Sequence, residues 1–300
     1  MNKKQKLVAL TGASSTGKSS LAVEAAKFFG GEVISADSRY VYKYLDISTA
    51  KPTKEEMQGI KHHLIDIYEV TQNYTAGLFV KDAEEIIRQL SQKGKIPIVA
   101  GGTGLYFRSL SGEFDIPEVK PDEQFRQQAE KKESEELYSD LLKKAPELAE
   151  KIHPNNKRKI IRALELANSG AKIKSKDSPY EILLIRLDSS ERQFLYANSE
   201  KRVDKMLENG LFEECKFLCK KYGENNILQN TIGIKELIPY IREKCPPQSA
   251  IEEIKKNTRH YIKRQISWFN GDKNSNILYI DKSPDIKSEA FSLIQKFLND

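Results

Sequence analysis

The sequence predicts an α/β fold in which a parallel sheet forms the core and a helical domain is inserted between two of its strands. Short apolar segments alternate with amphipathic helical segments over the first 112 residues. This alternation is typical of a parallel sheet covered by helices on both faces. A charged stretch without strand signals follows, and a strand-like segment then returns near residue 180. We therefore expect one core domain that is interrupted by an insertion.

The first half of the chain contains the repeating strand and helix signals. We expect strands over KLVALTG (6–12), EVISAD (32–37), HHLIDIYEV (62–70) and IPIVA (96–100). Helices are expected over KSSLAVEAAKFFGG (18–31) and TAGLFVKDAEEIIRQLSQKGK (75–95). The second helix has apolar residues at helical spacing, with Gly94 suited to its C-terminal cap. The loops after Leu10, Ala36 and Ala100 then share the carboxyl edge of the sheet, where such sheets bind ligands.

The second half of the chain is mostly helical. We expect a P-loop core domain over residues 1–112 and 181–300, and a helical insertion domain over residues 113–180. The core resumes with the strand YEILLIRLD (180–188). Helices are then expected over 191–209, 211–222, 233–242 and 247–269, followed by the strand NILYID and a final helix.

Composition excludes several protein classes. The chain has 300 residues, 39% hydrophobic and 31% charged, which is typical of a globular protein. Its apolar runs are too short to cross a membrane. The segment MNKKQKLVAL lacks a signal-peptide layout. We expect a cytoplasmic, monomeric protein that does not bind membranes. Three cysteines do not suggest a disulfide framework, and Cys215 and Cys219 are expected to pack in a helix.

Basic residues gather in two segments although the net charge is only +6. One is KKNTRHYIKR (255–264), where Lys256, Arg259, His260 and Lys263 share the polar side of a predicted helix. The other contains Lys157, Arg158, Lys159 and Arg162. Two separated basic clusters could hold a long polyanion such as RNA. They could also be two solvated helix faces, and charge alone slightly favours that interpretation.

A phosphate-binding loop is the clearest motif. Its eight residues are Gly12, Ala13, Ser14, Ser15, Thr16, Gly17, Lys18 and Ser19, and they match G-x-x-x-x-G-K-[ST] without a mismatch. The backbone N–H groups and the following helix N-terminus favour phosphate oxygens. Lys18 adds a positive charge, and the Ser19 hydroxyl could ligate Mg²⁺. The strand 96–100 ends in GGTG rather than an acidic residue, and N-K-x-D is absent, which argues against motor ATPases and GTPases.

Asp37 lies at the predicted end of the second strand, beside the phosphate loop. A carboxylate there could accept a proton from an acceptor substrate or bind Mg²⁺. The alternative is an aspartate that only caps a turn. Tyr40 and Tyr42 follow it and could stack on a base or pack in the core.

Several blocks together resemble the bacterial tRNA isopentenyltransferase (tRNA dimethylallyltransferase) family over about residues 6–270. They include GASSTGKSSLA, EVISADSRYVYKYLDISTAKPT, GKIPIVAGGTGLYFRSL, IHPNNKRKIIRALEL, RVDKMLENGLFEE, IGIKEL and TRHYIKRQISWF, in the family's order. The resemblance implies a P-loop nucleotide-kinase-like core with a helical insertion that grips the tRNA anticodon stem-loop. It also implies transfer of a dimethylallyl group from dimethylallyl diphosphate to the exocyclic amine of the adenosine 3′-adjacent to the anticodon.

The resemblance assigns roles to individual residues. Asp37 matches the general base, Ser19 the hydroxyl that holds Mg²⁺, Thr103 a contact to the target nucleotide, and Arg202 the diphosphate-binding arginine. The remaining matches are tRNA contacts: Asp37, Ser38, Arg39, Tyr40, Thr103, Arg126, Arg158, Lys159, Ile160, Ile161, Arg162, Asn230, Thr231, Ile232, Gly233, Ile234 and Lys235. Asn198, Ile234 and Lys61 depart from the residues usual in the family.

Three other functions compete with this hypothesis. A small-molecule kinase explains Lys18, Ser19 and Asp37, but neither the basic clusters nor the GGTGLY turn. An adenylate isopentenyltransferase acts on free nucleotides, whereas the long insertion favours a polymer acceptor. A non-enzymatic RNA-binding protein would not need the intact phosphate loop.

Overall fold

The structure is a computed structural model that describes residues 4–113, 119, 122–170, 178–272 and 274–300. It divides into two compact units. Unit 1 comprises Met1–Ser111 and Ser178–Asp300, and unit 2, the insertion, comprises Gly112–Asp177.

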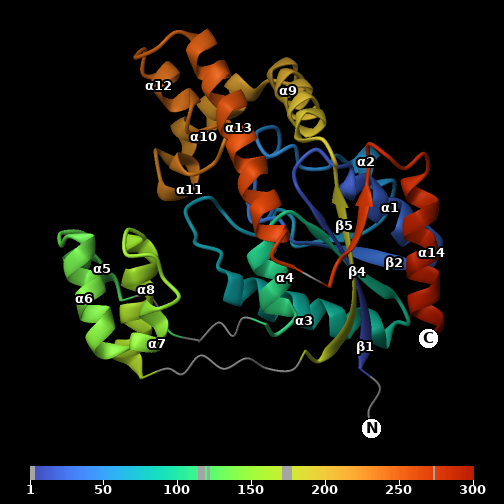
Figure 1. The fold of residues 1–300 in the computed structure, drawn as a ribbon. Coiled ribbons are helices and arrows are strands. Elements are labelled where there is room, and N and C mark those ends of the chain that lie inside the picture. The colour runs from blue at the N-terminus through green and yellow to red at the C-terminus, as the bar shows by residue number, and fades with distance from the viewer. Residues whose placement is uncertain (1–3, 114–118, 120–121, 171–177, 273) are drawn as a thin grey trace. The chain divides into compact units, whose positions relative to one another are not determined.

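Unit 1 is built on a six-stranded parallel sheet (Figure 1). The strands are β1 (Gln5–Gly12), β2 (Gly31–Ser35), β3 (His62–His63), β4 (Ile96–Gly101), β5 (Tyr180–Asp188) and β6 (Asn276–Tyr279). Their order is β3-β2-β4-β1-β5-β6. The predicted α/β fold class is confirmed. Because the strands are parallel, the loops after β1, β2 and β4 meet at one edge.

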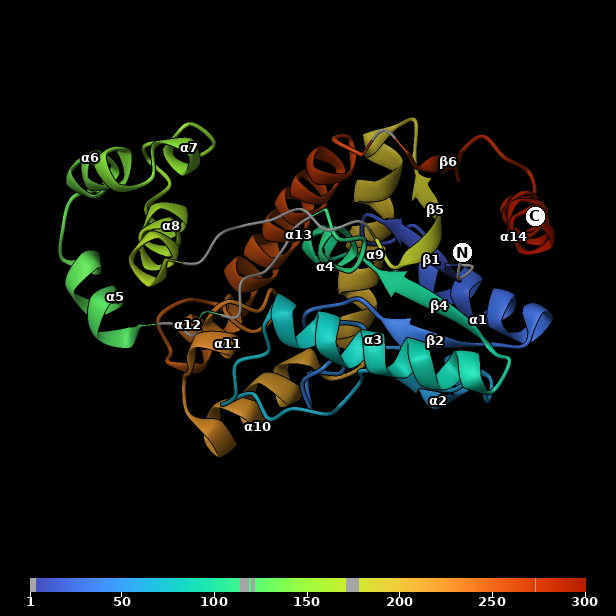
Figure 2. The same ribbon diagram turned by 90° about the horizontal axis from the view of Figure 1, so that it is seen from below.

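Helices cover both faces of this sheet (Figures 1 and 2). Val8 and Leu10 of β1 pack against α1 (Lys18–Phe29) and α14 (Ile286–Asn299). Leu7 and Ala9 point to the opposite face and pack with α3 (Ala76–Gln92) and α4 (Gly104–Leu110). The alternation buries the central strand on both faces, which explains its continuous apolar sequence.

A second core in unit 1 consists of helices. They are α9 (Arg192–Glu208), α10 (Leu211–Tyr222), α11 (Asn226–Gln229), α12 (Leu237–Ile241) and α13 (Pro247–Phe269). Their apolar faces enclose Val41, Tyr42 and Leu45 from the segment after β2. A short helix, α2 (Lys54–Met57), follows that segment. Within the described residues, no helix is long and apolar enough to cross a membrane.

The insertion contains α5 (Glu123–Glu130), α6 (Ser134–Lys144), α7 (Pro146–Ala149) and α8 (Lys157–Ser169). Leu137 and Leu141 of α6 pack against Ile160 and Leu164 of α8 in its own small core. The hydrophobic spacing of these helices is sufficient to bury one face of each.

Two expected elements differ from the structure. The predicted strand 62–70 is wrong beyond β3, because Leu64 and Asp66 adopt positive φ angles of 62° and 56°. The predicted helix 233–242 is wrong at its start, because Gly233 has a φ of 94° and its N–H donates to the side chain of Glu236. The helix α12 begins only at Leu237.

Leu141 and Leu142 provide a matched test of the insertion core, since Leu141 is fully buried and Leu142 is 45% exposed. Leu141→Ala should destabilise the insertion by about 2–5 kcal/mol through a cavity, and Leu142→Ala by less than about 1 kcal/mol. Hydrogen exchange on the full chain should show faster exchange in α6 and α8 for Leu141→Ala only. Equal effects of the two substitutions would contradict this assignment of the core.

Candidate active site

The phosphate loop connects β1 to the N-terminus of α1. Gly12 has a φ of 149°, and a Cβ at this position would lie 2.3 Å from the carbonyl oxygen of Leu187. Ser15 and Gly17 also have positive φ angles, of 66° and 82°. Gly17 caps α1 without any side chain that accepts from the first-turn N–H groups. The loop therefore leads into a helix N-terminus that no side chain caps, as an anion site requires.

Lys18 is the first residue of α1, and its ammonium group turns back onto the loop. Nζ donates to the carbonyl oxygen of Ala13 at 3.1 Å. Burial and, to a smaller extent, the positive charge of Arg202 lower the pKa of Lys18 to about 8, while Asp37 opposes the shift. Two cations and one carboxylate therefore share this site. A bound polyanion would stabilise both cations.

Asp37 and Thr103 come from the loops after β2 and β4, which are hydrogen-bonded to each other. The N–H of Ser38 donates to Oγ1 of Thr103 at 3.1 Å, and the N–H of Thr103 donates to the carbonyl oxygen of Ala36 at 3.2 Å. Asp37 Oδ1 accepts from the N–H of Arg39 at 2.8 Å. The carboxylate of Asp37 is thereby oriented by a main-chain donor.

Arg202, on α9, reaches the same site from the helical part of unit 1. Its Nη2 donates to the carbonyl oxygen of Thr49 at 2.5 Å. Its Nε is buried without a hydrogen-bond partner among the described residues. The neighbouring Tyr40 hydroxyl donates to the carbonyl oxygen of Ala50 at 3.0 Å. Burial raises the pKa of Tyr40 to about 12, so its hydroxyl stays protonated. Arg202 therefore brings a second cation to this site, with an Nε donor for which the described residues supply no acceptor.

Arg202 and Tyr40 donate to carbonyl groups of one loop, at Thr49 and Ala50. Glu214 of α10 fixes this loop. The Glu214 carboxylate accepts from the N–H groups of Asp46, Ile47 and Ser48 at 2.9, 2.6 and 2.9 Å. Three hydrogen bonds to one carboxylate define the path of this loop. Glu214 was not among the predicted site residues, because its partners are remote in sequence.

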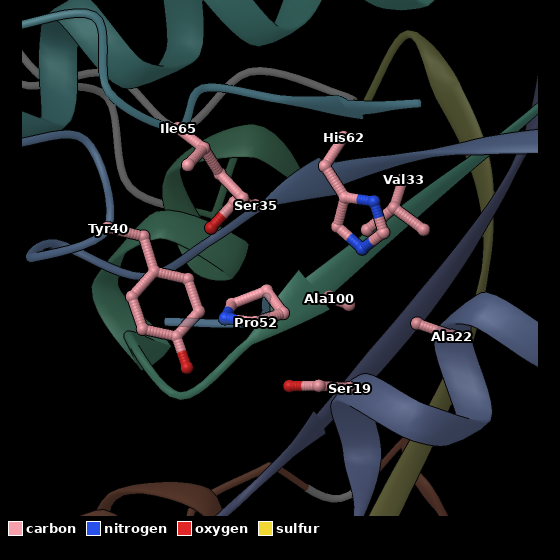
Figure 3. A pocket seen from close by; sticks show the side chains of 9 residues that line it. All are labelled: Ser19, Ala22, Val33, Ser35, Tyr40, Pro52, His62, Ile65 and Ala100. Carbon is pink, nitrogen blue, oxygen red and sulfur yellow. The ribbon is translucent and has the colours of Figure 1, made fainter. Parts of the chain in front are cut away.

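A small pocket lies beside Ser19 (Figure 3). Its lining side chains come from α1, β2, β3, β4 and the segments that follow β2 and β3: Ser19, Ala22, Val33, Ser35, Tyr40, Pro52, His62, Ile65 and Ala100. The wall is largely apolar, and Oγ of Ser35 has no hydrogen-bond partner among the described residues. The hydroxyl of Ser19 lies on the wall of this pocket.

The predicted tRNA-contacting segment 230–235 lies against the Asp37 loop. Arg39 Nη2 donates to the carbonyl oxygen of Asn230 at 3.1 Å. Thr231 and Ile234 are buried, and Gly233 approaches Ser48 so closely that a Cβ would lie 3.2 Å from it. Ile232 is partly buried, whereas Asn230 is exposed and Lys235 is partly exposed. We expect Asn230 and Lys235 to offer side chains to RNA, while the buried members shape the segment.

The basic side of α13 is partly neutralised by α9. Lys255 pairs with Asp204 at 2.6 Å, and Arg259 pairs with Glu200 at 2.5 Å. Lys263, by contrast, is exposed on the same helix. The charge available to phosphates on this helix is therefore smaller than its sequence indicates.

In the insertion, two predicted RNA-binding arginines share one buried carboxylate. Arg126 Nε and Nη2 donate to Glu165 at 2.7 and 2.9 Å, and Arg162 Nη1 donates to it at 3.0 Å. Burial alone would raise the pKa of Glu165, but the hydrogen bonds from both arginines outweigh it and lower that pKa. Arg126 on α5 thereby joins α5 to α8, whereas Arg162 pairs with Glu165 within α8, so both arginines stabilise the insertion.

The stretch 158–161 divides between surface and core. Ile160 and Ile161 are 0% and 4% exposed, so their side chains pack in the insertion and are not available to RNA. Arg158 and Lys159 precede them on the exposed side of α8. Contacts of this stretch with a polyanion are therefore expected from Arg158 and Lys159.

The described residues contain no cluster of three or more His, Cys, Asp or Glu side chains suited to a metal ion. Cys215 is buried and donates to the carbonyl oxygen of Ile234 at 3.7 Å. His63 lies 2.6 Å from Glu32, as a structural histidine would. Any metal at the phosphate loop would have Ser19 as its protein ligand and would take its remaining oxygens from substrate or water.

Known proteins resemble this chain in sequence and in fold. The family model described as IPP transferase matches residues 40–272. A protein named tRNA dimethylallyltransferase from Thermoanaerobacter sp. is 42% identical over 88% of this chain and 89% of its own length. One of the same name from Streptococcus agalactiae is 42% identical over 93% of both chains.

Solved structures give the same result. The tRNA Δ(2)-isopentenylpyrophosphate transferase of Staphylococcus epidermidis is 35% identical and superposes with a TM-score of 0.74, covering 98% of this chain and 99% of its own. A eukaryotic dimethylallyltransferase acting on tRNA is 28% identical, with a TM-score of 0.83 over 98% of this chain and 80% of its own. The chain belongs to the IPP transferase family, whose matching members are named tRNA dimethylallyltransferases.

Proposed function

We propose that this chain transfers a dimethylallyl group from dimethylallyl diphosphate to a tRNA. The acceptor is the exocyclic amine (N6) of the adenosine 3′-adjacent to the anticodon, in tRNAs that read codons beginning with U. Diphosphate is released. The observation that carries this proposal is the meeting of a phosphate loop, two cations and the Asp37 carboxylate at one sheet edge. The names of the matching relatives support it.

On the donor side, the diphosphate occupies the phosphate loop as a leaving group. The bond between the allylic carbon and oxygen breaks, so negative charge grows on the diphosphate. Backbone N–H groups, Lys18 and Arg202 stabilise that charge. The unpaired Nε of Arg202 is a preorganised donor for this purpose.

Mg²⁺ is the metal that this donor set fits. Ser19 offers one hydroxyl oxygen on the wall of the pocket, and Mg²⁺ prefers oxygen ligands while keeping substrate oxygens and waters. Bound there, Mg²⁺ would neutralise charge on the departing diphosphate.

On the acceptor side, the adenine amine attacks the allylic carbon and forms the new N–C bond. Its proton passes to Asp37, whose carboxylate is held by the Arg39 N–H. Thr103, which is hydrogen-bonded to the Asp37 loop, positions the target nucleotide. Asp37 through Tyr40, Asn230 and Lys235 would contact the RNA here, and the insertion would grip the anticodon stem-loop through Arg158 and Lys159.

A small-molecule kinase remains the main competing function for the same phosphate loop. Incubation with ATP alone and with dimethylallyl diphosphate plus unmodified tRNA separates the two. Prenylated adenosine detected by mass analysis of the tRNA supports transfer. Hydrolysis of ATP without tRNA, with no modified adenosine, would instead show that the loop acts on ATP and would contradict the transfer.

Asp37→Asn or Asp37→Ala should lower turnover by about 10²-fold or more, because the amine loses its proton acceptor. Binding of tRNA should remain close to that of the unsubstituted protein. Single-turnover kinetics and filter binding measure the two quantities. An unchanged turnover number would exclude Asp37 as the base.

Pyrophosphate affinity should depend on the ionisation of Lys18, whose pKa is lowered to about 8 in the free protein. The ammonium form binds the anion, so affinity falls as the pH rises through 8. A decrease of up to about thirtyfold is expected between about pH 7 and pH 9.5, because the ammonium fraction falls by that factor. Lys18→Met serves as the control, because calorimetry on it records the titration of pyrophosphate itself. Parallel pH profiles for the two proteins would rule out this role of Lys18.

Arg158→Ala combined with Lys159→Ala should weaken tRNA binding. It should also reduce the slope of log affinity against log salt by about one for each phosphate that the protein no longer neutralises. Arg162→Ala should instead lower the stability of the insertion, since it leaves the buried Glu165 with one arginine fewer. Binding titrations over a salt series and thermal unfolding distinguish these effects. An unaltered salt slope in the double variant would show that these residues do not contact the tRNA backbone.

A further inference from the structure

The side chain of Gln265, on α13, joins two loops of the sheet edge. It is 6% exposed. Its Oε1 accepts from the N–H of Ser14 at 2.9 Å and from the Ser14 hydroxyl at 3.2 Å. Its Nε2 donates to the carbonyl oxygen of Gly102 at 3.0 Å. One buried amide therefore bonds the phosphate loop and the turn after β4 at the same time.

These two loops carry opposite halves of the proposed site. Ser14 belongs to the loop that would hold the diphosphate. Gly102 directly precedes Thr103, which is hydrogen-bonded to Ser38 beside Asp37. The sheet itself pairs β1 with β4 only as far as Thr11 and Gly101. Beyond those residues the Gln265 amide continues the connection between the two loops.

The chemistry of the bridge requires an amide. The Ser14 side needs an acceptor and the Gly102 side needs a donor, and glutamine offers both at one end of a flexible chain. A Cβ at Gly102 would lie 2.3 Å from Nε2 of Gln265. Glycine at position 102 therefore leaves the space that the Gln265 amide occupies. The N–H of Ser14 thereby donates to Gln265 rather than to a ligand.

We infer that Gln265 is a positioning residue that sets the distance between the phosphate loop and the Thr103–Asp37 side of the site. This inference rests on the proposed function. In the transfer, the allylic carbon is held from one loop and the attacking amine from the other. A misplacement of about 1 Å between reacting groups can cost about 10²-fold in rate. Gln265 contacts neither group, so its removal should affect turnover more than binding.

Gln265→Met keeps the length of the side chain and removes all three hydrogen bonds. We expect kcat to fall about 10- to 100-fold, with KM for dimethylallyl diphosphate and for tRNA each within about threefold of the unsubstituted value. Gln265→Asn keeps the amide but is one methylene too short to reach both loops, and should show the same pattern. Gln248→Met is the matched control, because Gln248 is an exposed glutamine on the same helix.

Two kinetic results would overturn the inference. One is a kcat in both Gln265 variants within about twofold of the control, even if their melting temperatures are lower, because that is the behaviour of a packing residue. The other is a large rise in KM for the prenyl donor at unchanged kcat, which would make Gln265 a binding residue.

A second measurement does not depend on the transfer reaction. Trp268 is the single tryptophan of the chain. Its ring packs on Gly104, where a Cβ would lie 2.1 Å from Cδ1, so its emission reports on the turn after β4. Inorganic pyrophosphate with Mg²⁺ should change this emission in the unsubstituted protein. Gln265→Met should bind pyrophosphate with similar affinity by calorimetry but without the emission change.

The outcomes distinguish failure of the Gln265 link from failure of the proposed function. An equal emission change in both proteins, or none in either despite binding, would refute the link through Gln265 and leave the proposed function standing. Failure of the unsubstituted protein to bind pyrophosphate would refute the proposed function itself, together with this inference.

Discussion

The close approach of main-chain segments at the ends of four strands, β1, β2, β4 and β5, is the constraint on which the site depends. Gly12 lies against the carbonyl of Leu187, and Gly101 lies so near Ala36 that a Cβ would be 2.2 Å from its carbonyl oxygen. Side chains at these positions would push the loops apart. Because these positions are glycines, the phosphate loop and the Asp37 loop lie close enough to contact the same pair of substrates. The hydrogen bonds of each loop to its neighbours depend on this close approach.

The site has an excess of positive charge in the free protein, and a bound anion would neutralise it. Lys18 and Arg202 repel each other, and Asp37 compensates only in part. An unfolded lysine keeps its proton to a higher pH, so the folded chain carries an unfavourable charge below about pH 8, which is relieved as the pH rises. This unfavourable charge lies at the place where a diphosphate would compensate it. Such a trade of stability for preorganised charge is common at catalytic sites.

Local signals predicted much of this molecule, and long-range contacts account for the errors. The bounds of β5, α10 and α13 and the phosphate loop follow from contiguous patterns of apolar residues and glycines. The strand expected to continue through Asp66 ends early, because Asp66 turns to pair with the buried Lys51. Gln265 could not be predicted as a bridge, since its partner Ser14 is 251 residues away in the sequence. Its place in the TRHYIKRQISWF block was the available signal.

The basic clusters show why charge in a sequence overstates charge on a surface. Both clusters contain arginines whose charge is paired in the fold: Glu200 on α9 binds Arg259, and Glu165 binds Arg162 on α8. In the insertion this pairing has a structural use, because the Glu165 carboxylate also accepts from Arg126 and thereby joins α5 to α8. The arginines that pair with Glu165 hold α8 in position. Arg158 and Lys159 lie on the exposed face of α8. A polyanion would then meet exposed positive charges on a helix that is fixed in place, which favours defined contacts over general attraction.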